Sequence, residues 1–234
     1  TLRNLPDLGR LRNAGIDALP RLPDTREEVI EIARTQPGTT EADMLLGRRA
    51  SEGNVKTWPL DGYRIIHFAT HGLVPGDLNG LNEPALALSA PEVTGEKDED
   101  GLLTAAEIMA LDLSADWAVL SACNTAASGS DDAEAFSGLG GAFFYAGTKA
   151  LLLSNWPVHS GATTRLMTTL FRMQAKDRGL EGTQAHRRAM MALVDGPGLT
   201  DETGRTLFSY AHPIFWAPFT VVGDGGGAGA FPGN

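Results

Sequence analysis

The fold of this chain is decided by the run Trp117-Ala118-Val119-Leu120-Ser121-Ala122-Cys123, which is apolar almost throughout and ends at the only cysteine. A continuous apolar run of this length predicts a strand buried on both faces, as in a parallel sheet. A similar run, residues 63–70, leads directly into His71 and Gly72. Because the carboxyl ends of parallel strands meet at one edge of a sheet, we expect the Cys123 thiol and the His71 imidazole to meet there.

Strands and helical patterns alternate along the rest of the chain, which predicts an α/β fold with a parallel, doubly wound sheet. The expected strands are residues 63–69, 84–88, 117–122, 149–154 and 219–222. A helix is expected to open at Asp24, with Asp24 or Thr25 as its cap and Val29, Ile30, Ile32 and Ala33 as its apolar face. Further helices are expected near residues 51–55, 104–110, 136–146, 162–175 and 183–194.

The expected domain organisation is simple. Residues 1–23 form an irregular lead-in, residues 24–224 a single folded domain, and residues 225–234 a flexible glycine-rich tail. Residues 90–101 and 125–133 have the composition of surface loops. The chain starts without methionine, so we expect a fragment or a processed form.

The composition excludes several classes of protein. Of 234 residues, 42% are hydrophobic and 21% are charged, as in a protein with a sizeable core, and the net charge of −10 argues against nucleic-acid or anionic-membrane partners. One cysteine forms no internal disulfide, which makes a reducing cytoplasm the default. With one cysteine and scattered histidines, no metal site is expected. The glycine-rich stretch at Gly223 loosely matches the dinucleotide-binding fingerprint, but no helix follows it to receive a pyrophosphate, so no cofactor is expected.

A thiol beside an imidazole is the chemistry of a cysteine nucleophile and its base. A free cysteine is often only a small buried apolar residue, but Cys123 stands at a strand end before a polar loop. His71 is the expected base, whereas His67 lies within its apolar run and is expected to be a buried, hydrogen-bonded core residue. Gly72 is expected to let the backbone turn tightly, so that its N–H and that of Cys123 form an oxyanion hole.

The remaining histidines carry weaker expectations. His159 follows Trp156 past a third strand end, where it could line the same cleft. His186 stands beside two arginines on a helical face and is expected to be solvated, and His212 is expected to pack against its aromatic neighbours.

The chain resembles CHAT domains, which are caspase-like peptidases often joined to tetratricopeptide repeats. The two blocks His67-Phe68-Ala69-Thr70-His71-Gly72 and Leu120-Ser121-Ala122-Cys123-Asn124-Thr125 carry the resemblance, supported in order by residues 24–29, 101–108, 134–143 and 212–219. It implies a caspase–haemoglobinase fold with a six-stranded, mostly parallel sheet between helices. It also implies peptide-bond hydrolysis by a Cys–His dyad, with His71 as base, Cys123 as nucleophile and the Gly72 N–H as an oxyanion contact. A bacterial cytoplasmic source and an upstream repeat-containing sensor region would fit the family.

One departure from the family concerns substrate choice. CHAT domains usually carry aspartates after the tryptophan that corresponds to Trp156, and these acids can hold a basic side chain of the substrate, but residues 156–160 contain none. Neighbouring loops could supply the charge, or the pocket could accept neutral residues. The candidates for substrate binding are Asp77, Asp131, Asp132, Glu134, Trp156 and His159.

The sequence thus predicts a cysteine endopeptidase acting on protein substrates, with no nucleic-acid or membrane partner. An upstream region or an activator protein is expected to regulate it by ordering residues 90–101 and 125–135. The alternative is a caspase-like scaffold in a bacterial signalling or defence system that binds partners without cutting them. A cysteine-dependent transferase would use the same residues. The presence of both His71 and Cys123 favours an enzyme over the scaffold.

Overall fold

The centre of the protein is a four-stranded sheet, seen here in a computed structural model that describes residues 15–121, 130–156 and 158–224, with the side chains of residues 130–137 left out. The strand order is β1-β5-β6-β9, with the first three strands parallel and the last antiparallel. Their bounds are β1 Ile65–Phe68, β5 Trp117–Leu120, β6 Ala150–Ser154 and β9 Phe219–Gly223.

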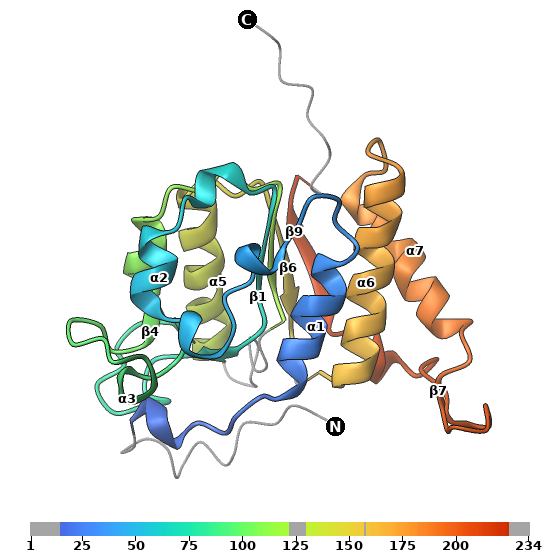
Figure 1. Cartoon of the computed structure of the whole chain (residues 1–234), viewed down its shortest axis with the longest axis horizontal. Coiled ribbons are helices and arrows are strands. Elements are labelled where there is room, and N and C mark those ends of the chain that lie inside the picture. The colour runs from blue at the N-terminus through green and yellow to red at the C-terminus, as the bar shows by residue number, and fades with distance from the viewer. Residues whose placement is uncertain (1–14, 122–129, 157, 225–234) are drawn as a thin grey trace, which may run out of the picture.

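Helices cover both faces of this sheet (Figure 1). On one face α1 (Asp24–Ala33), α6 (Ser160–Lys176) and α7 (Gly182–Val194) bury one cluster of apolar side chains with Trp117 and Val119 of β5. On the other face α2 (Glu52–Thr57), α4 (Ala105–Met109) and α5 (Ser130–Tyr145) bury a second cluster with Ala118 and Leu120. The alternation of β5 side chains between the two clusters explains why the whole strand is apolar.

A second, antiparallel sheet lies beside the first and begins with His71. It has the order β2-β3-β4, with β2 His71–Leu73, β3 Ala85–Ala87 and β4 Leu102–Thr104. The remaining elements are α3 Pro91–Thr94, the hairpin of β7 Leu199–Thr200 and β8 Thr206–Phe208, and short 3₁₀ turns at Ile16–Ala18, Glu41–Asp43, Gly47–Arg49, Leu60–Gly62 and Pro213–Phe215. No helix in the described part of the chain is both long and apolar enough to cross a lipid bilayer.

The expected strands and helices are confirmed, with three corrections. The run at residues 84–88 forms β3 of the antiparallel sheet, so the main sheet has four strands among the described residues, where six were expected. Neither Asp24 nor Thr25 caps α1: its N-cap is Pro23, and the Thr25 hydroxyl donates to the carbonyl of Leu22. His186 is not solvated, because it is only 6% exposed on α7.

Gly147 allows a close approach between two segments at the end of α5. Its φ is +113°, and a Cβ built there would lie 1.9 Å from the carbonyl oxygen of Leu113. No L-residue fits this position without moving the backbone. By contrast, Gly141 lies within α5 with no described atom within 4 Å of a Cβ.

We therefore expect Gly147→Ala and Gly141→Ala to change stability in opposite directions. Gly147→Ala should lower the free energy of unfolding by more than about 2 kcal/mol through overpacking and backbone strain. Gly141→Ala should raise it by about 0.5–1 kcal/mol, because alanine is the better helix former. Urea unfolding followed by circular dichroism measures both values, and equal midpoints for the two variants would contradict the close approach at Gly147.

The burial of His186 makes the stability of the fold depend on pH. Burial lowers the pKa of His186 to about 4, and its Nε2 has no hydrogen-bond partner within the described segments. The imidazole is therefore neutral in the folded protein, whereas the unfolded chain takes up a proton below the ordinary histidine pKa of about 6.5. The stability that the neutral His186 contributes is therefore fully present above pH 6.5 and is lost as the pH falls towards 4.

We expect His186→Leu to remove this loss. Between pH 7 and pH 4 the unfolding free energy of the wild type should fall by up to about 3 kcal/mol more than that of the variant. Denaturant titrations at pH 7, 5.5 and 4.5 test this difference. Parallel pH dependences would show that His186 does not titrate differently in the folded and unfolded states.

Candidate active site

His71 is the first residue of β2 and is only 5% exposed. Its Nε2 lies 2.8 Å from the backbone carbonyl oxygen of Pro20, which is 51 residues earlier in the chain. A carbonyl oxygen only accepts hydrogen bonds, so Nε2 must carry a proton. This bond fixes the ring orientation and leaves Nδ1 as the nitrogen that can take up or release a proton.

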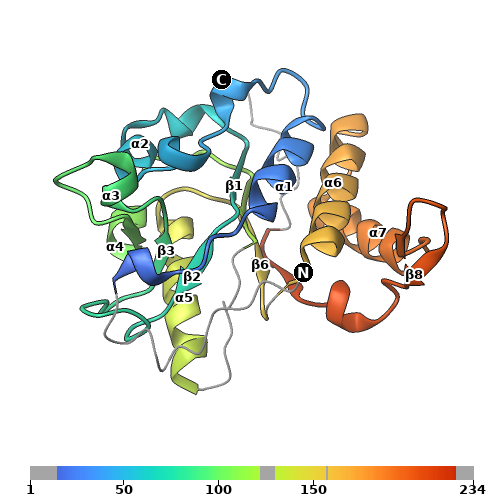
Figure 2. The same ribbon diagram turned by 60° about the horizontal axis from the view of Figure 1, so that its bottom comes forward.

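Pro20 belongs to a segment that crosses the antiparallel sheet, residues 16–23, which we call the strap. Ile16 and Leu19 of the strap pack against the buried apolar cluster of Leu73, Leu78, Leu81, Ala85 and Ala87. Figure 2 shows the strap running beside β2 before it enters α1. Packing of these two side chains therefore holds the Pro20 carbonyl over His71.

Gly72 lies in the extended strand β2, opposite Leu86 of β3. The tight turn expected at this glycine is therefore wrong, and the chain turns instead at residues 74–77. There the Asp77 carboxylate accepts a hydrogen bond of 2.8 Å from the Val74 N–H and is buried. Asp77 thus stabilises the loop that follows β2, next to the predicted base.

Trp156 and His159 lie just beyond the carboxyl end of β6. Trp156 is 37% exposed, and its indole N–H reaches the Ile214 carbonyl oxygen at 3.5 Å. The His159 ring is the N-cap of α6, because its Nδ1 accepts from the Ala162 N–H at 3.3 Å. It also packs against an aromatic cluster of Phe208, Tyr210 and Phe215. Burial lowers the pKa of His159, which favours the neutral ring that a cap requires.

Four predicted site residues fall where the structure gives no side-chain geometry. Cys123 lies outside the described residues, and so do the side chains of Asp131, Asp132 and Glu134 in α5. The pairing of His71 with Cys123, and the role of the three acids, therefore stay predictions.

His67 is engaged elsewhere, as expected for a core histidine. Its side chain is 8% exposed, and Nε2 lies 2.8 Å from the Ser121 hydroxyl and 3.1 Å from the Glu28 carboxylate. An imidazole bound in this way by the core is not available as a base at the surface. His71 remains the better candidate.

An acidic cluster fastens the 90–101 loop to the body of the protein. Lys56 Nζ lies 2.5, 2.7 and 2.6 Å from carboxylate oxygens of Glu52, Glu99 and Glu107. These three carboxylates are close enough together to bind a metal ion, but the ammonium group already lies among them. Burial raises the pKa of Glu52 to about 7, although Lys56 acts against this shift.

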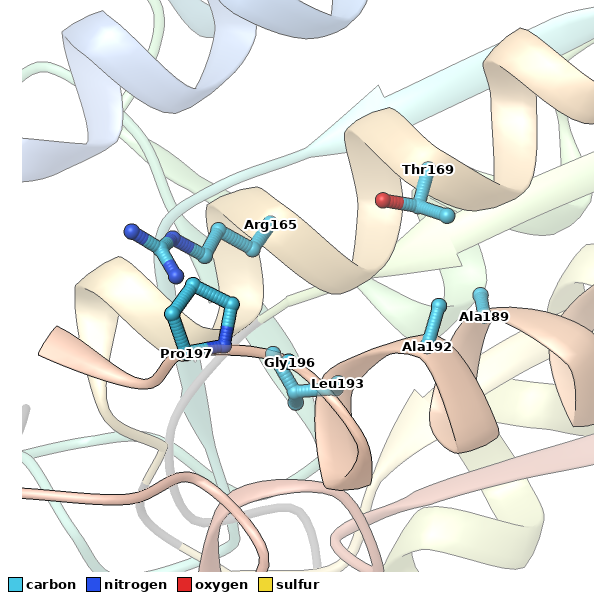
Figure 3. A pocket seen from close by; sticks show the side chains of 7 residues that line it. All are labelled: Arg165, Thr169, Ala189, Ala192, Leu193, Gly196 and Pro197. Carbon is cyan, nitrogen blue, oxygen red and sulfur yellow. The ribbon is translucent and has the colours of Figure 1, made fainter.

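Neither of two hollows on the described surface is lined by His71, Asp77, Trp156 or His159. The smaller, of about 100 Å³, lies between α6 and α7 with the turn that follows α7, and is lined in part by Arg165 (Figure 3). Its guanidinium donates to the Gly198 carbonyl at 2.6 Å, which indicates a structural role. The larger, of about 430 Å³, lies between α1 and residues 39–49.

Comparison with protein families identifies the family of this chain. The family model described as the CHAT domain matches residues 10–224, which is nearly the whole chain. The chain belongs to the CHAT domain family. The match includes the strap, both sheets and the helices of this CHAT domain, and so covers every residue of the candidate site. No curated protein matches the chain.

The sequence did not reveal the part of this site that the backbone supplies. His71 and the polar residues near the strand ends were found from their position after apolar runs. The Pro20 carbonyl was missed, because every residue has a carbonyl and only the folded strap brings this one to His71. The proline-rich composition of the lead-in was the only signal there, and it predicted irregular structure.

Proposed function

We propose that this CHAT domain is a cysteine endopeptidase in which Cys123 is the nucleophile and His71 is the general base. The observation that carries the proposal is the hydrogen bond from His71 Nε2 to the Pro20 carbonyl. It supplies the orienting partner that a catalytic imidazole needs and leaves Nδ1 for proton transfer. Membership in a family related to caspase-like cysteine peptidases supports the same reaction.

The reaction would proceed in two steps. His71 Nδ1 takes the proton of the Cys123 thiol, and the thiolate sulfur attacks the peptide carbonyl carbon. The N–H groups of Gly72 and Cys123 stabilise the oxyanion of the tetrahedral intermediate. The imidazolium, whose Nε2–H points at the Pro20 carbonyl, then protonates the leaving amine. Water finally attacks the thioester with His71 again as base, releasing the acid and the free thiol.

The proposed substrates are proteins bound across the carboxyl ends of β1, β5 and β6. Trp156 is exposed beside this edge, and its ring suits a flat apolar contact with the residue before the cut. Asp77 is buried in the loop after β2. Recognition of a basic residue would therefore depend on Asp131, Asp132 or Glu134 at the start of α5.

The strap offers a route for regulation by upstream sequence. The strap carries the Pro20 carbonyl that contacts His71. A repeat-containing sensor region or an activator protein that moved the strap would therefore change the orientation of the base. We place such an activator, together with the protein substrate, among the partners of this domain. The caspase–haemoglobinase fold and a bacterial cytoplasmic setting belong to the same proposal, and the parallel β1-β5-β6 core between helices is compatible with that fold.

Removal of either dyad residue tests the chemistry. We expect the wild-type chain to cleave members of a diverse peptide library, Cys123→Ala to be inactive, and His71→Ala to lose about 10²–10⁴-fold in kcat/KM. Mass spectrometry of the products gives the residue before each cut. Cleavage that survives in Cys123→Ala after repurification would contradict the mechanism. Binding of protein partners without any cleavage would favour the scaffold.

Loosening the strap tests the role of the Pro20 carbonyl. Leu19→Ala removes an apolar contact that holds the strap on the antiparallel sheet. We expect about a tenfold fall in kcat with little change in KM, because the base loses its orientation whereas the substrate-binding site is unchanged. The matched control is Leu207→Ala on the exposed hairpin, where the leucine is 51% exposed. Equal kinetics for the two variants would contradict the role of the strap.

A further inference from the structure

A carboxylate is buried in the core directly under the candidate site. Glu28 of α1 is 0% exposed, and its Oε1 lies 2.5 Å from the Ser121 hydroxyl and 3.1 Å from His67 Nε2. The hydroxyl and the imidazole are themselves 2.8 Å apart. The three side chains therefore form one closed network, which joins a helix to two strands of the sheet.

The direction of the hydrogen bonds in this network follows from the donors available. A carboxylate accepts only, so the Ser121 hydroxyl donates to Glu28. The Ser121 oxygen can then accept from His67, whose Nε2–H is shared between the hydroxyl and the carboxylate. Both donors are thus directed at the Glu28 carboxylate, because a carboxylate buried without hydrogen-bond donors would cost several kcal/mol.

The network is not a second catalytic triad, although it contains serine, histidine and an acid. In such a triad the acid holds the histidine nitrogen that does not face the serine. Here Glu28 and Ser121 both contact the same nitrogen of His67. Ser121 is also completely buried, so no substrate can reach its hydroxyl.

The location of the network connects it to the proposed dyad. His67 belongs to β1, four residues before His71, and Ser121 follows β5, two residues before Cys123. The Ser121 N–H also donates to the Phe68 carbonyl at 3.1 Å, which ties the two strand ends together. Glu28 lies in the helix that continues the strap, and Figure 2 shows this helix beside β1.

We propose that Glu28 is a positioning residue that, through Ser121 and His67, fixes the ends of β1 and β5 relative to each other. The strand ends lead to the general base and to the nucleophile, so their relative position sets the contact between imidazole and thiol. This inference rests on the proposed function, because it assigns Glu28 to the geometry of that dyad. In this proposal Glu28 does not contact the substrate, and it acts on the reaction through Ser121 and His67.

The test uses the single cysteine as its own reporter. The rate of alkylation by iodoacetamide measured across pH gives the thiolate content at one defined residue, with or without peptidase activity. Glu28→Gln keeps the shape of the side chain but replaces a charged acceptor with a neutral one. We expect alkylation of this variant at pH 7 to be about tenfold slower, its pH profile to move to higher pH, and kcat to fall while KM stays nearly constant. Ser121→Ala, which removes the bridging hydroxyl but keeps the backbone bond to Phe68, should have the same effect on alkylation.

The matched control lies at the opposite ends of the same strands. Asp116 is also a buried carboxylate, with Arg64 Nε at 2.6 Å and Lys149 Nζ at 2.8 Å. Asp116→Asn should lower stability like Glu28→Gln but leave the alkylation profile unchanged. A wild-type profile for both Glu28→Gln and Ser121→Ala, or equal changes in Glu28→Gln and Asp116→Asn, would overturn the positioning role.

The two proposals fail in different ways. If the wild type cleaves no peptide and His71→Ala leaves the alkylation profile unchanged, the dyad itself is wrong, and the positioning role falls with it. If His71→Ala changes the profile and Glu28→Gln does not, the dyad stands and only the positioning role is overturned.

Discussion

Burial of the central strand on both faces is the constraint on which the rest of this structure depends. Every residue from Trp117 to Leu120 is buried, because helices cover the sheet on both sides. An unpaired charge within this strand would cost several kcal/mol, so polar groups are confined to its ends. At the amino end Asp116 binds two basic side chains, and beyond the carboxyl end Ser121 binds Glu28 and His67. The candidate active site lies just beyond the carboxyl end of this strand, where polar side chains are no longer surrounded by the apolar core.

This constraint also explains how much of the fold could be predicted from the sequence. Apolar runs identified the four described strands of the main sheet, of which β5 is buried throughout and β9 is largely exposed. The run at residues 84–88 was assigned to that sheet by the same rule, yet it pairs with its neighbours in an antiparallel sheet. Three consecutive buried residues have the same sequence pattern in a parallel and in an antiparallel sheet, because the pattern indicates burial and not the pairing partner. The same limit applies to His186, whose burial depends on helix packing that its polar neighbours in the chain do not indicate.

At the site, the sequence identified side chains but not the contacts that orient them. His71 could be chosen over His67 because it follows the apolar run, and the structure shows His67 held inside the core. Glu28 stands near the start of the helix expected to open at Asp24, where acidic residues are usually solvated. Its partner Ser121 is 93 residues away, so nothing nearby in the sequence marks it as buried. The Pro20 carbonyl has no side-chain signature at all. Contacts of this kind become visible only in the folded chain.

The separation of these contacts along the chain has a consequence for biosynthesis. The strap and α1 leave the ribosome before any strand of the main sheet, and at that stage Glu28 and the Pro20 carbonyl have nothing to bind. Pro20 gains its partner once His71 has been made, whereas Glu28 gains His67 shortly before that and Ser121 only after residue 121. The two strand ends are thus joined only when about half of the domain has been synthesised. A nascent chain that stops before residue 121 therefore lacks the bond between Glu28 and Ser121, and under the proposed function it also lacks its nucleophile, Cys123.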